Sequence, residues 1–385
     1  MKKFILFLLV IYLFIPLNIK AENLSLATNA KSAIMLEVST GEIIFEKNSH
    51  ERLHPASMTK MMSLLIIMES IENGIIKLDD MVTVSANASG MGGSQILLET
   101  NEQMSVDDLI KGVTIASGND AVVALAERIA GTEEQFVNMM NEKVQELGLQ
   151  DTNFKNSHGL DAANHYSSAH DMAIIGKELV KHEKILEYSS IYEMYLRENT
   201  DRKVWLVNTN KLVRFYEGVD GLKTGYTKEA GYCLTATAKR GDMRLIAVVM
   251  GEPDSATRNS EVTGLLDYAF AQYEVEKLLS KDSIIGETMI EKAKTKYVEL
   301  VPTEDVTVLN KKIDGKKNAT YEVEIDKISA PITNGTVVGK LHIKENDNII
   351  RTINVTVKED IEKANIFELY VRYLKEILTG DVKVI

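Results

Sequence analysis

Segments with a strand pattern stand at both ends of residues 22–279, and segments with a helical pattern stand between them. Near the start, residues 33–38 and 42–45 flank Ser39-Thr40-Gly41, which predicts a β-hairpin. Near the end, residues 232–238 and 244–250 predict two more strands, joined by a polar turn. Strands contributed by both ends predict one antiparallel sheet with a helical cluster inserted, an α/β (α+β) class of fold.

The helices expected between these strands are marked by apolar periodicity and by stop residues. Residues 57–71 are rich in Met, Leu and Ile and close at Asn73-Gly74, as expected of a buried helix. The other predicted helices span residues 106–116, 121–130, 133–147, 169–181 and about 260–279. Together these segments predict a first domain over residues 22–279.

The composition changes after about residue 280. β-branched residues alternate with polar ones, and Gly315 and Asn334-Gly335 interrupt the runs, so residues 280–360 predict a small all-β domain. Residues 361–385 predict an amphipathic helix. Its apolar face carries Phe367, Tyr370, Leu374 and Ile377. The pattern alone allows a membrane-surface anchor or a helix that packs on a partner, because interfacial helices usually carry more basic charge.

Residues 1–21 have the layout of a signal peptide. Lys2 and Lys3 precede an apolar run over residues 4–15, and Ala21 stands at the expected cleavage point. A run of about 12 apolar residues is too short to span a bilayer comfortably. We therefore expect an exported protein, with an uncleaved N-terminal anchor as the alternative.

Charge and cysteine content exclude several classes of function. The 385-residue chain has a formal net charge of −12, which argues against nucleic acid as a partner. Its single cysteine, Cys233, lies in an apolar stretch and is expected to be buried rather than nucleophilic. His165, His170 and Asp171 do not have zinc-ligand spacing, and no Gly-rich phosphate loop occurs, so we expect no metal and no cofactor.

Ser57-Met58-Thr59-Lys60 is the segment that most strongly indicates chemistry. Residues three apart on a helix share one face, so the Lys60 amine can reach the Ser57 hydroxyl. A serine hydroxyl needs a base beside it, and lysine can act as one when burial or a nearby cation lowers its pKa. The helix N-terminus also supplies N–H groups suited to a developing oxyanion.

Two further segments could complete such a site. Ser117-Gly118-Asn119 stands between two predicted helices and could relay a proton and hold an amide, although such residues are also ordinary turn and cap residues. Ser85-Ala86-Asn87 has the same pattern, which shows how weak the pattern is. Lys223-Thr224-Gly225 precedes a strand and could hold a substrate carboxylate at a sheet edge, or could be an exposed turn.

The order of the three segments resembles that of the penicillin-recognising serine enzymes. Their spacings, together with three further stretches, are similar to those of the low-molecular-mass D-alanyl-D-alanine carboxypeptidases. These stretches are Gly92–Gln95, Asn156–Asp161 and Ser167–Met172. The resemblance covers residues 28–277 and, more loosely, the β-rich domain and the terminal helix. It implies a β-lactamase/transpeptidase-like fold and favours the membrane-anchor interpretation of the helix.

The resemblance also implies roles for individual residues. Ser57 would be the acylated nucleophile and Lys60 its base, while Ser117 would take part in catalysis and Asn119 would line the cleft. It implies that peptidoglycan stem peptides are the substrate and that β-lactam antibiotics are inhibitors.

In the third segment, the resemblance assigns substrate binding to Lys223, Thr224, Gly225 and Tyr226. Lys223 and Thr224 would bind the terminal carboxylate. Backbone N–H groups of Ser57 and Tyr226 would form the oxyanion hole; some relatives carry histidine where Tyr226 stands.

Two rival functions remain open at this point. One large branch of β-lactamases uses a glutamate on a loop between the second and third segments, with an asparagine four residues later. Within residues 120–220, Glu134 and Asn138 meet that spacing, but they lie inside a predicted helix and too near Ser117. We therefore expect slow turnover of penicillins. A non-catalytic wall scaffold is the other rival, disfavoured because all three segments are intact.

Overall fold

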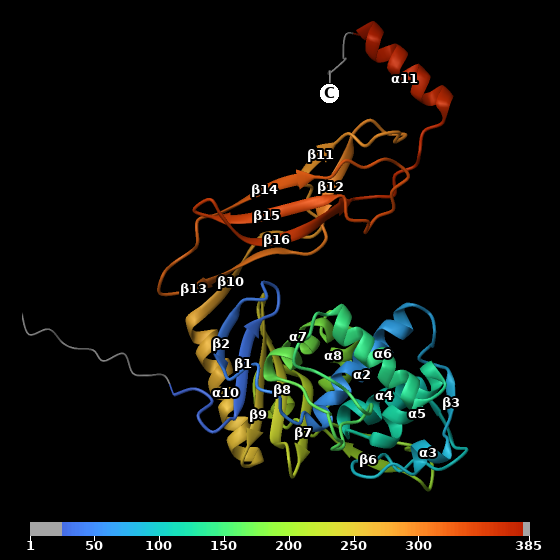
Figure 1. Cartoon of the computed structure of the whole chain (residues 1–385), viewed down its shortest axis with the longest axis vertical. Helices are drawn as coiled ribbons and strands as arrows, with labels where there is room; N and C mark the ends of the chain where they lie inside the picture. Colours follow the sequence, from blue (N-terminus) through green and yellow to red (C-terminus); the bar gives the residue numbers. More distant parts are fainter. Residues whose placement is uncertain (1–24, 380–385) are drawn as a thin grey trace, which may run out of the picture.

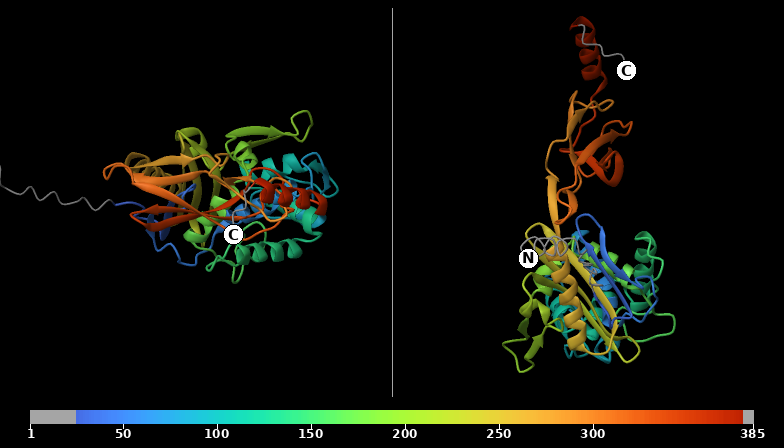
Figure 2. Two further views of the ribbon diagram at one scale, coloured as in Figure 1. Left: turned by 90° about the horizontal axis from the view of Figure 1, so that it is seen from above. Right: turned by 90° about the vertical axis from the view of Figure 1, so that its left-hand side faces the viewer.

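A computed structural model describes residues 25–379. The predicted signal peptide, residues 1–21, lies outside the described residues. A sheet-and-helix body, a β-rich body and a terminal helix follow one another along the long axis of the molecule (Figures 1 and 2).

The main sheet is antiparallel and combines strands from both ends of the first domain, as predicted. Its strand order is β2-β1-β9-β8-β7, so the N-terminal hairpin pairs with a strand from the far end of that domain. The strands are β1 (Ser32–Glu37), β2 (Ile43–Lys47), β7 (Val219–Thr227), β8 (Gly231–Arg240) and β9 (Met243–Glu252).

Alternate side chains of β1 face two different hydrophobic cores. Ile34 and Leu36 pack into the helical cluster on one face of the sheet. Ala33 and Met35 pack against α10 (Ser255–Gln272) on the other. Both faces of the sheet are therefore covered at its centre, which explains why the neighbouring strands β1 and β9 are mostly apolar.

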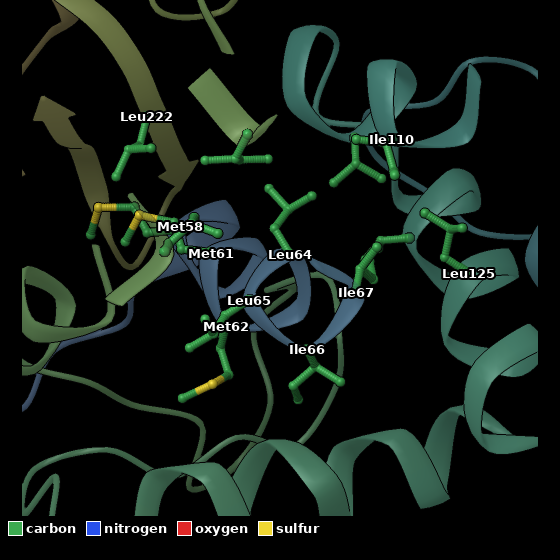
Figure 3. Packing of buried hydrophobic residues seen from close by; sticks show 14 of the residues in the cluster. Met58, Met61, Met62, Leu64, Leu65, Ile66, Ile67, Ile110, Leu125 and Leu222 are labelled. Carbon is green, nitrogen blue, oxygen red and sulfur yellow. The ribbon is translucent and has the colours of Figure 1, made fainter. Parts of the chain in front are cut away.

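The helical cluster surrounds α2 (Figure 3). This helix is almost entirely buried, with Met61, Leu64 and Ile67 packed among Ile110 and Leu125 of neighbouring helices. The elements of the cluster are η1 (Ala56–Thr59), α2 (Lys60–Glu72), α3 (Ala86–Ser89), α4 (Val106–Ile115), α5 (Asn119–Ala130), α6 (Glu133–Glu146), α7 (Ala169–Leu179) and α8 (Lys184–Ser189), whereas α9 (Leu212–Phe215) packs in the core on the α10 side. Two small hairpins accompany them, β3 (Met81–Thr83) with β4 (Gln103–Ser105) and β5 (Glu193–Leu196) with β6 (Val204–Val207).

The predicted helix over residues 260–279 is wrong at both ends. Helix α10 starts five residues earlier because the Asp254 side chain accepts hydrogen bonds from the N–H groups of Ala256 and Thr257. It ends at Gln272, and Tyr273–Leu279 forms strand β10, which pairs with a strand beyond the predicted boundary at residue 279. The alternation of Tyr, Glu and Val at 273–276 is a strand pattern that the helical prediction overlooked.

The C-terminal region is β-rich, and its fold class agrees with the prediction. Its five-stranded sheet has the order β11-β12-β16-β15-β14, and β10 pairs separately with β13. The strands are β10 (Tyr273–Leu279), β11 (Gly286–Thr288), β12 (Val298–Pro302), β13 (Val306–Lys311), β14 (Ala319–Ile325), β15 (Gly339–Glu345) and β16 (Asn348–Val357).

The terminal helix α11 (Ile366–Thr379) lies at the far end of the molecule from the helical cluster (Figure 1). Arg372 ties it to the β-rich region by donating to the backbone oxygens of Ala293 and Lys294. The predicted apolar residues Phe367, Tyr370, Leu374 and Ile377 are all exposed. Among residues 25–379, no helix is both long and apolar enough to cross a bilayer.

Candidate active site

Ser57 lies on a tight turn at the entrance to α2. Residues 56–59 form one turn of 3₁₀-helix, and the N–H of Met58 donates to the carbonyl oxygen of Pro55. The α-helix then begins at Lys60. The predicted position of Ser57 at a helix N-terminus is therefore confirmed, with the difference that the first turn is 3₁₀.

The Lys60 amine makes three contacts in a buried setting. Its Nζ lies 3.0 Å from Ser57 Oγ, 2.6 Å from Asn119 Oδ1 and 2.6 Å from the carbonyl oxygen of His158. Two of these partners can only accept, so two N–H bonds of the amine point at them. Ser57 is the one partner able to donate, and a neutral amine would direct its lone pair at that hydroxyl. The arrangement is that of a base poised on an alcohol.

The surroundings of Lys60 favour the neutral amine. Burial lowers the pKa of Lys60 well below its usual value, and the nearby charge of Lys223 lowers it further, while Asp120 opposes both effects. The Asp120 carboxylate is occupied by backbone N–H groups of Ile96 and Leu98. A lysine that loses its proton at moderate pH can serve as a general base.

The segment Ser117-Gly118-Asn119 lies beside this amine. Asn119 Nδ2 donates to the backbone oxygen of Gly92 at 2.7 Å, which orients the amide so that Oδ1 faces Lys60. The N–H of Asn119 also donates to the Ser94 oxygen, so the stretch at 92–95 fixes the loop. By contrast, Ser85 is only a helix cap that accepts from the N–H of Ala88.

Ser117 is held in an unusual state. Its φ is +63°, which is costly for a residue with a side chain and tends to occur at functional sites. It is 3% exposed, and its hydroxyl has no hydrogen-bond partner within residues 25–379. A buried hydroxyl without a partner is available to a ligand or a transferred proton.

Lys223, Thr224 and Gly225 lie on β7, the edge strand of the main sheet, and not in an exposed turn. A Cβ on Gly225 would stand 2.7 Å from the oxygen of Pro55 and 3.1 Å from the Ala56 Cβ. Only glycine permits this approach, which lays the strand against the turn that carries Ser57. The Tyr226 side chain, next along the strand, is 56% exposed.

Positive charge accumulates around Lys223. Burial lowers the pKa of Lys223 to about 7, and the neighbouring guanidinium of Arg258 contributes to that lowering. Arg258 is itself buried on α10, and within the described residues its guanidinium donates only to Asn259 Oδ1. Among residues 25–379, Lys223 donates to the backbone oxygen of Thr224, and neither Lys223 nor Arg258 forms a salt bridge. Buried cations without counter-ions create a potential that suits an anionic ligand.

Several other residues that shape the site were not found from the sequence. Arg258 has no motif around it, so no pattern distinguished it from a surface arginine. The backbone oxygen of His158 anchors Lys60, and Gly159, with φ +91°, lies so close to the Ala56 oxygen that no Cβ would fit. The stretch 156–161, which resembles the same family, is the sequence signal that points to these two residues. Thr209 accepts from the Thr224 hydroxyl at 2.7 Å.

The residues that the sequence analysis judged not to be catalytic lie in environments that do not suit a catalytic role. Burial is the main cause that lowers the pKa of His158 to about 4, and its Nδ1 accepts from the N–H of Leu160 in its own loop, as expected of a structural role. Cys233 is fully buried, and burial raises its pKa to about 11, which confirms it as a small hydrophobe. Glu134 and Asn138 lie on the exposed side of α6, which leaves no structural ground for fast water attack by that pair.

A serine hydroxyl on a buried lysine, beside the buried side chains of Lys223 and Arg258, is the arrangement of a serine hydrolase suited to acyl substrates that carry a carboxylate. Comparison with known proteins identifies the family. The family model described as D-alanyl-D-alanine carboxypeptidase matches residues 18–254, and the one described as penicillin-binding protein 5, C-terminal domain, matches residues 273–363. The chain belongs to the D-alanyl-D-alanine carboxypeptidase family.

Individual relatives cover nearly the whole chain. It is 50% identical to D-alanyl-D-alanine carboxypeptidase DacF of Bacillus subtilis, over 92% of this chain and 90% of that protein. DacA of Haemophilus influenzae is 38% identical over 88% of this chain and 86% of that protein.

Solved structures of penicillin-binding proteins are similar to this chain as well. Penicillin-binding protein 5 of Haemophilus influenzae has a TM-score of 0.70 at 35% identity, covering 87% of this chain and 98% of that one. The ampicillin-bound penicillin-binding protein D2 of Listeria monocytogenes has a TM-score of 0.57 at 29% identity, covering 63% of this chain and 98% of that one. The predicted fold class and family are confirmed.

The close approach at Gly225 can be tested directly. We expect Gly225→Ala to lower the rate of acylation by a labelled penicillin by about tenfold or more, because the new methyl group forces β7 away from the turn of Ser57. Gly264→Ala, where a Cβ meets nothing within 4 Å, is the matched control and should acylate like the native protein. Equal rates for both variants would refute the positioning role of Gly225.

Proposed function

We propose that this serine-type D-Ala-D-Ala carboxypeptidase removes the terminal D-alanine from peptidoglycan pentapeptide stems, with Ser57 as nucleophile and Lys60 as its base. The observation that carries the proposal is the 3.0 Å contact of a fully buried lysine amine with Ser57 Oγ. The same serine would be acylated by penicillins, and structures of relatives contain bound ampicillin and cefotaxime.

The proposed reaction is a two-step acyl transfer. Ser57 Oγ attacks the carbonyl carbon of the penultimate D-alanine, and its proton passes to Lys60 Nζ. The peptide C–N bond breaks, and the nitrogen takes up a proton to leave as D-alanine. Water then attacks the ester: its oxygen joins the carbonyl carbon, the bond from that carbon to Ser57 Oγ breaks, and a proton from the water returns to Ser57 Oγ. The shortened stem leaves with a new carboxylate.

Each remaining site residue has a proposed role in these steps. Ser117, whose hydroxyl lacks a partner in the described chain, would relay the proton to the leaving nitrogen. Asn119 would hold Lys60 and the substrate amide. Lys223 and Thr224, with Arg258 behind them, would bind the terminal carboxylate, because a charged hydrogen bond to an anion is strong in a buried site.

The backbone N–H groups of Ser57 and Tyr226 would stabilise the oxyanion. Gly225 supports this role, since its lack of a side chain allows β7 to lie against the turn of Ser57.

We also propose that the protein is exported and acts at the outer face of the cytoplasmic membrane. The basic and apolar pattern of residues 1–21 supports export. The apolar residues of α11 are exposed, and away from a membrane they would face water. Their exposure supports a helix that lies on the membrane surface.

Replacement of the nucleophile gives the most direct test of the site. We expect Ser57→Ala to lose both the covalent penicillin adduct, measured by intact-protein mass, and D-alanine release from a short acyl-D-Ala-D-Ala peptide. Ser85→Ala, which removes only a helix cap, should keep both activities. A persistent adduct in Ser57→Ala would overturn the assignment, and rapid hydrolysis of penicillin by the native protein would favour a β-lactamase.

The pH dependence of kcat/KM should have two limbs. On the acid side, activity falls as Lys60 takes up a proton and ceases to be a base, at a pH well below the usual lysine range. On the alkaline side, activity falls as Lys223 loses its charge above about pH 7 and releases the carboxylate. Lys223→Arg keeps the charge and should move the alkaline limb upward. An unmoved limb would contradict the role; exposed Lys239→Arg is the control.

Membrane association is testable on lipid vesicles. We expect the full chain to co-sediment with vesicles of mixed zwitterionic and anionic lipid, and Phe367→Glu with Ile377→Glu to reduce the bound fraction about tenfold or more, because each buries a charge. Ile349→Glu places the same change at another exposed apolar residue of the C-terminal region and should bind normally. Normal binding of the α11 variant, or no binding of the native chain, would contradict the anchor.

A further inference from the structure

The β5–β6 hairpin presents two aromatic rings to solvent on one face. Tyr195 and Trp205 stand directly opposite each other in the antiparallel register, 46% and 58% exposed. The other face carries Leu196 and Leu206, which are buried in the core of the helical cluster. Cross-strand partners share a face of the sheet, so the two rings form one patch, here called the aromatic platform.

The aromatic platform is held rigidly next to the active site. The chain leaves β6 through Asn208, whose side-chain amide donates to two backbone oxygens, at Ser189 and Ile191. It continues to Thr209, whose N–H donates to Ile115 at the end of α4 and whose hydroxyl accepts from Thr224. The base of the hairpin therefore lies between the segments that hold Ser117 and Lys223.

The distal end of the hairpin is fixed as well. Arg197 and Arg202, one on each side of its turn, both bind the carboxylate of Glu102, at 2.6 Å and 2.9 Å. Arg197 also donates to the Ile96 oxygen. A surface immobilised at both ends loses little entropy when a ligand binds to it.

The chemistry of the aromatic platform suits a sugar ring. The axial C–H bonds of a pyranose form an apolar face with a slight positive charge, which matches the negative face of an aromatic ring. Lys203 Nζ lies over the Tyr195 ring, 3.9 Å from its centre, so it covers part of one ring face and leaves Trp205 as the more open ring. The exposed Glu193 lies on the same face of β5 as Tyr195, so hydroxyl and amide groups at the sugar edge would meet polar partners.

Other occupants fit less well. Two rings offer on the order of 200 Å² each, far less than the roughly 800 Å² per partner of a stable protein interface. Strand β6, which carries Trp205, also lies at the end of the molecule opposite α11, so a membrane bound by that helix would not reach it (Figure 1). The remaining candidate on this side of the active site is the wall itself.

We infer that the aromatic platform of Tyr195 and Trp205 binds the glycan strand of peptidoglycan, and so holds sugar-bearing substrate at the active site. The inference rests on the proposed function, because it takes the substrate to be a stem peptide attached to a strand of N-acetylated amino sugars. The platform is a binding surface outside the catalytic machinery.

Tryptophan fluorescence can test this inference without an added label. Trp205 is its one tryptophan, so tryptophan emission reports on the platform alone. Adding a peptide-free tetrasaccharide of alternating N-acetylglucosamine and N-acetylmuramic acid should change the emission saturably, at up to millimolar concentrations. A short acyl-D-Ala-D-Ala peptide should produce no such change. Absence of a saturable change with the tetrasaccharide, or a response to lipid vesicles in its place, would overturn the inference.

Kinetics provide a second readout, as the ratio of kcat/KM for disaccharide-pentapeptide to that for the sugar-free peptide. We expect Tyr195→Ala with Trp205→Ala to lower this ratio about five- to tenfold through KM, and Trp205→Phe to retain most of it. Tyr321→Ala, an exposed aromatic on β14, is the matched control and should keep the native ratio. An unchanged ratio in the platform variant would refute the inference, whereas inactivity of the native protein on both substrates would refute the proposed function.

Discussion

The burial of one lysine amine is the constraint on which the rest of the active site depends. Lys60 is fully enclosed, yet its partners are an amide oxygen, a backbone oxygen and the Ser57 hydroxyl, with no carboxylate of the described chain in salt-bridge contact. An ammonium ion is costly in such a place, and the charge of Lys223 adds to the cost. The packing around Lys60 thus favours the form that catalysis needs, a neutral amine in contact with the Ser57 hydroxyl.

Close backbone contacts bring the three active-site segments together. Gly225 lets β7 lie on the turn of Ser57, and Gly159 lets the loop that supplies the His158 oxygen pass against the same turn. Asn119 joins this group through its contact with Lys60. Segments far apart in the sequence meet because two glycines leave room for the backbone.

Much of this arrangement could be predicted from the sequence, because it depends on local patterns. The helical register places Lys60 one turn from Ser57, and the strand patterns at both ends of the domain define the sheet. Other features depend on tertiary contacts that leave no periodic trace. Arg258 belongs to the site because α10 packs on the sheet, and no sequence pattern indicates that contact. The strand at 273–279 follows α10 without a break, so the sequence pattern did not separate the two elements. The residue roles and the site of action remain predictions that the experiments above address.

The central claim is that the Lys60 amine loses its proton well below the usual lysine range, and its titration tests this most directly. Lysines labelled with ¹³C at Cε can be followed by NMR as the pH is raised, with Lys60→Arg and Lys223→Arg assigning the two buried groups. We predict that both signals titrate well below those of the exposed lysines, and that the Lys223 signal does so near pH 7. A Lys60 signal that titrates together with the exposed lysines would contradict the claim.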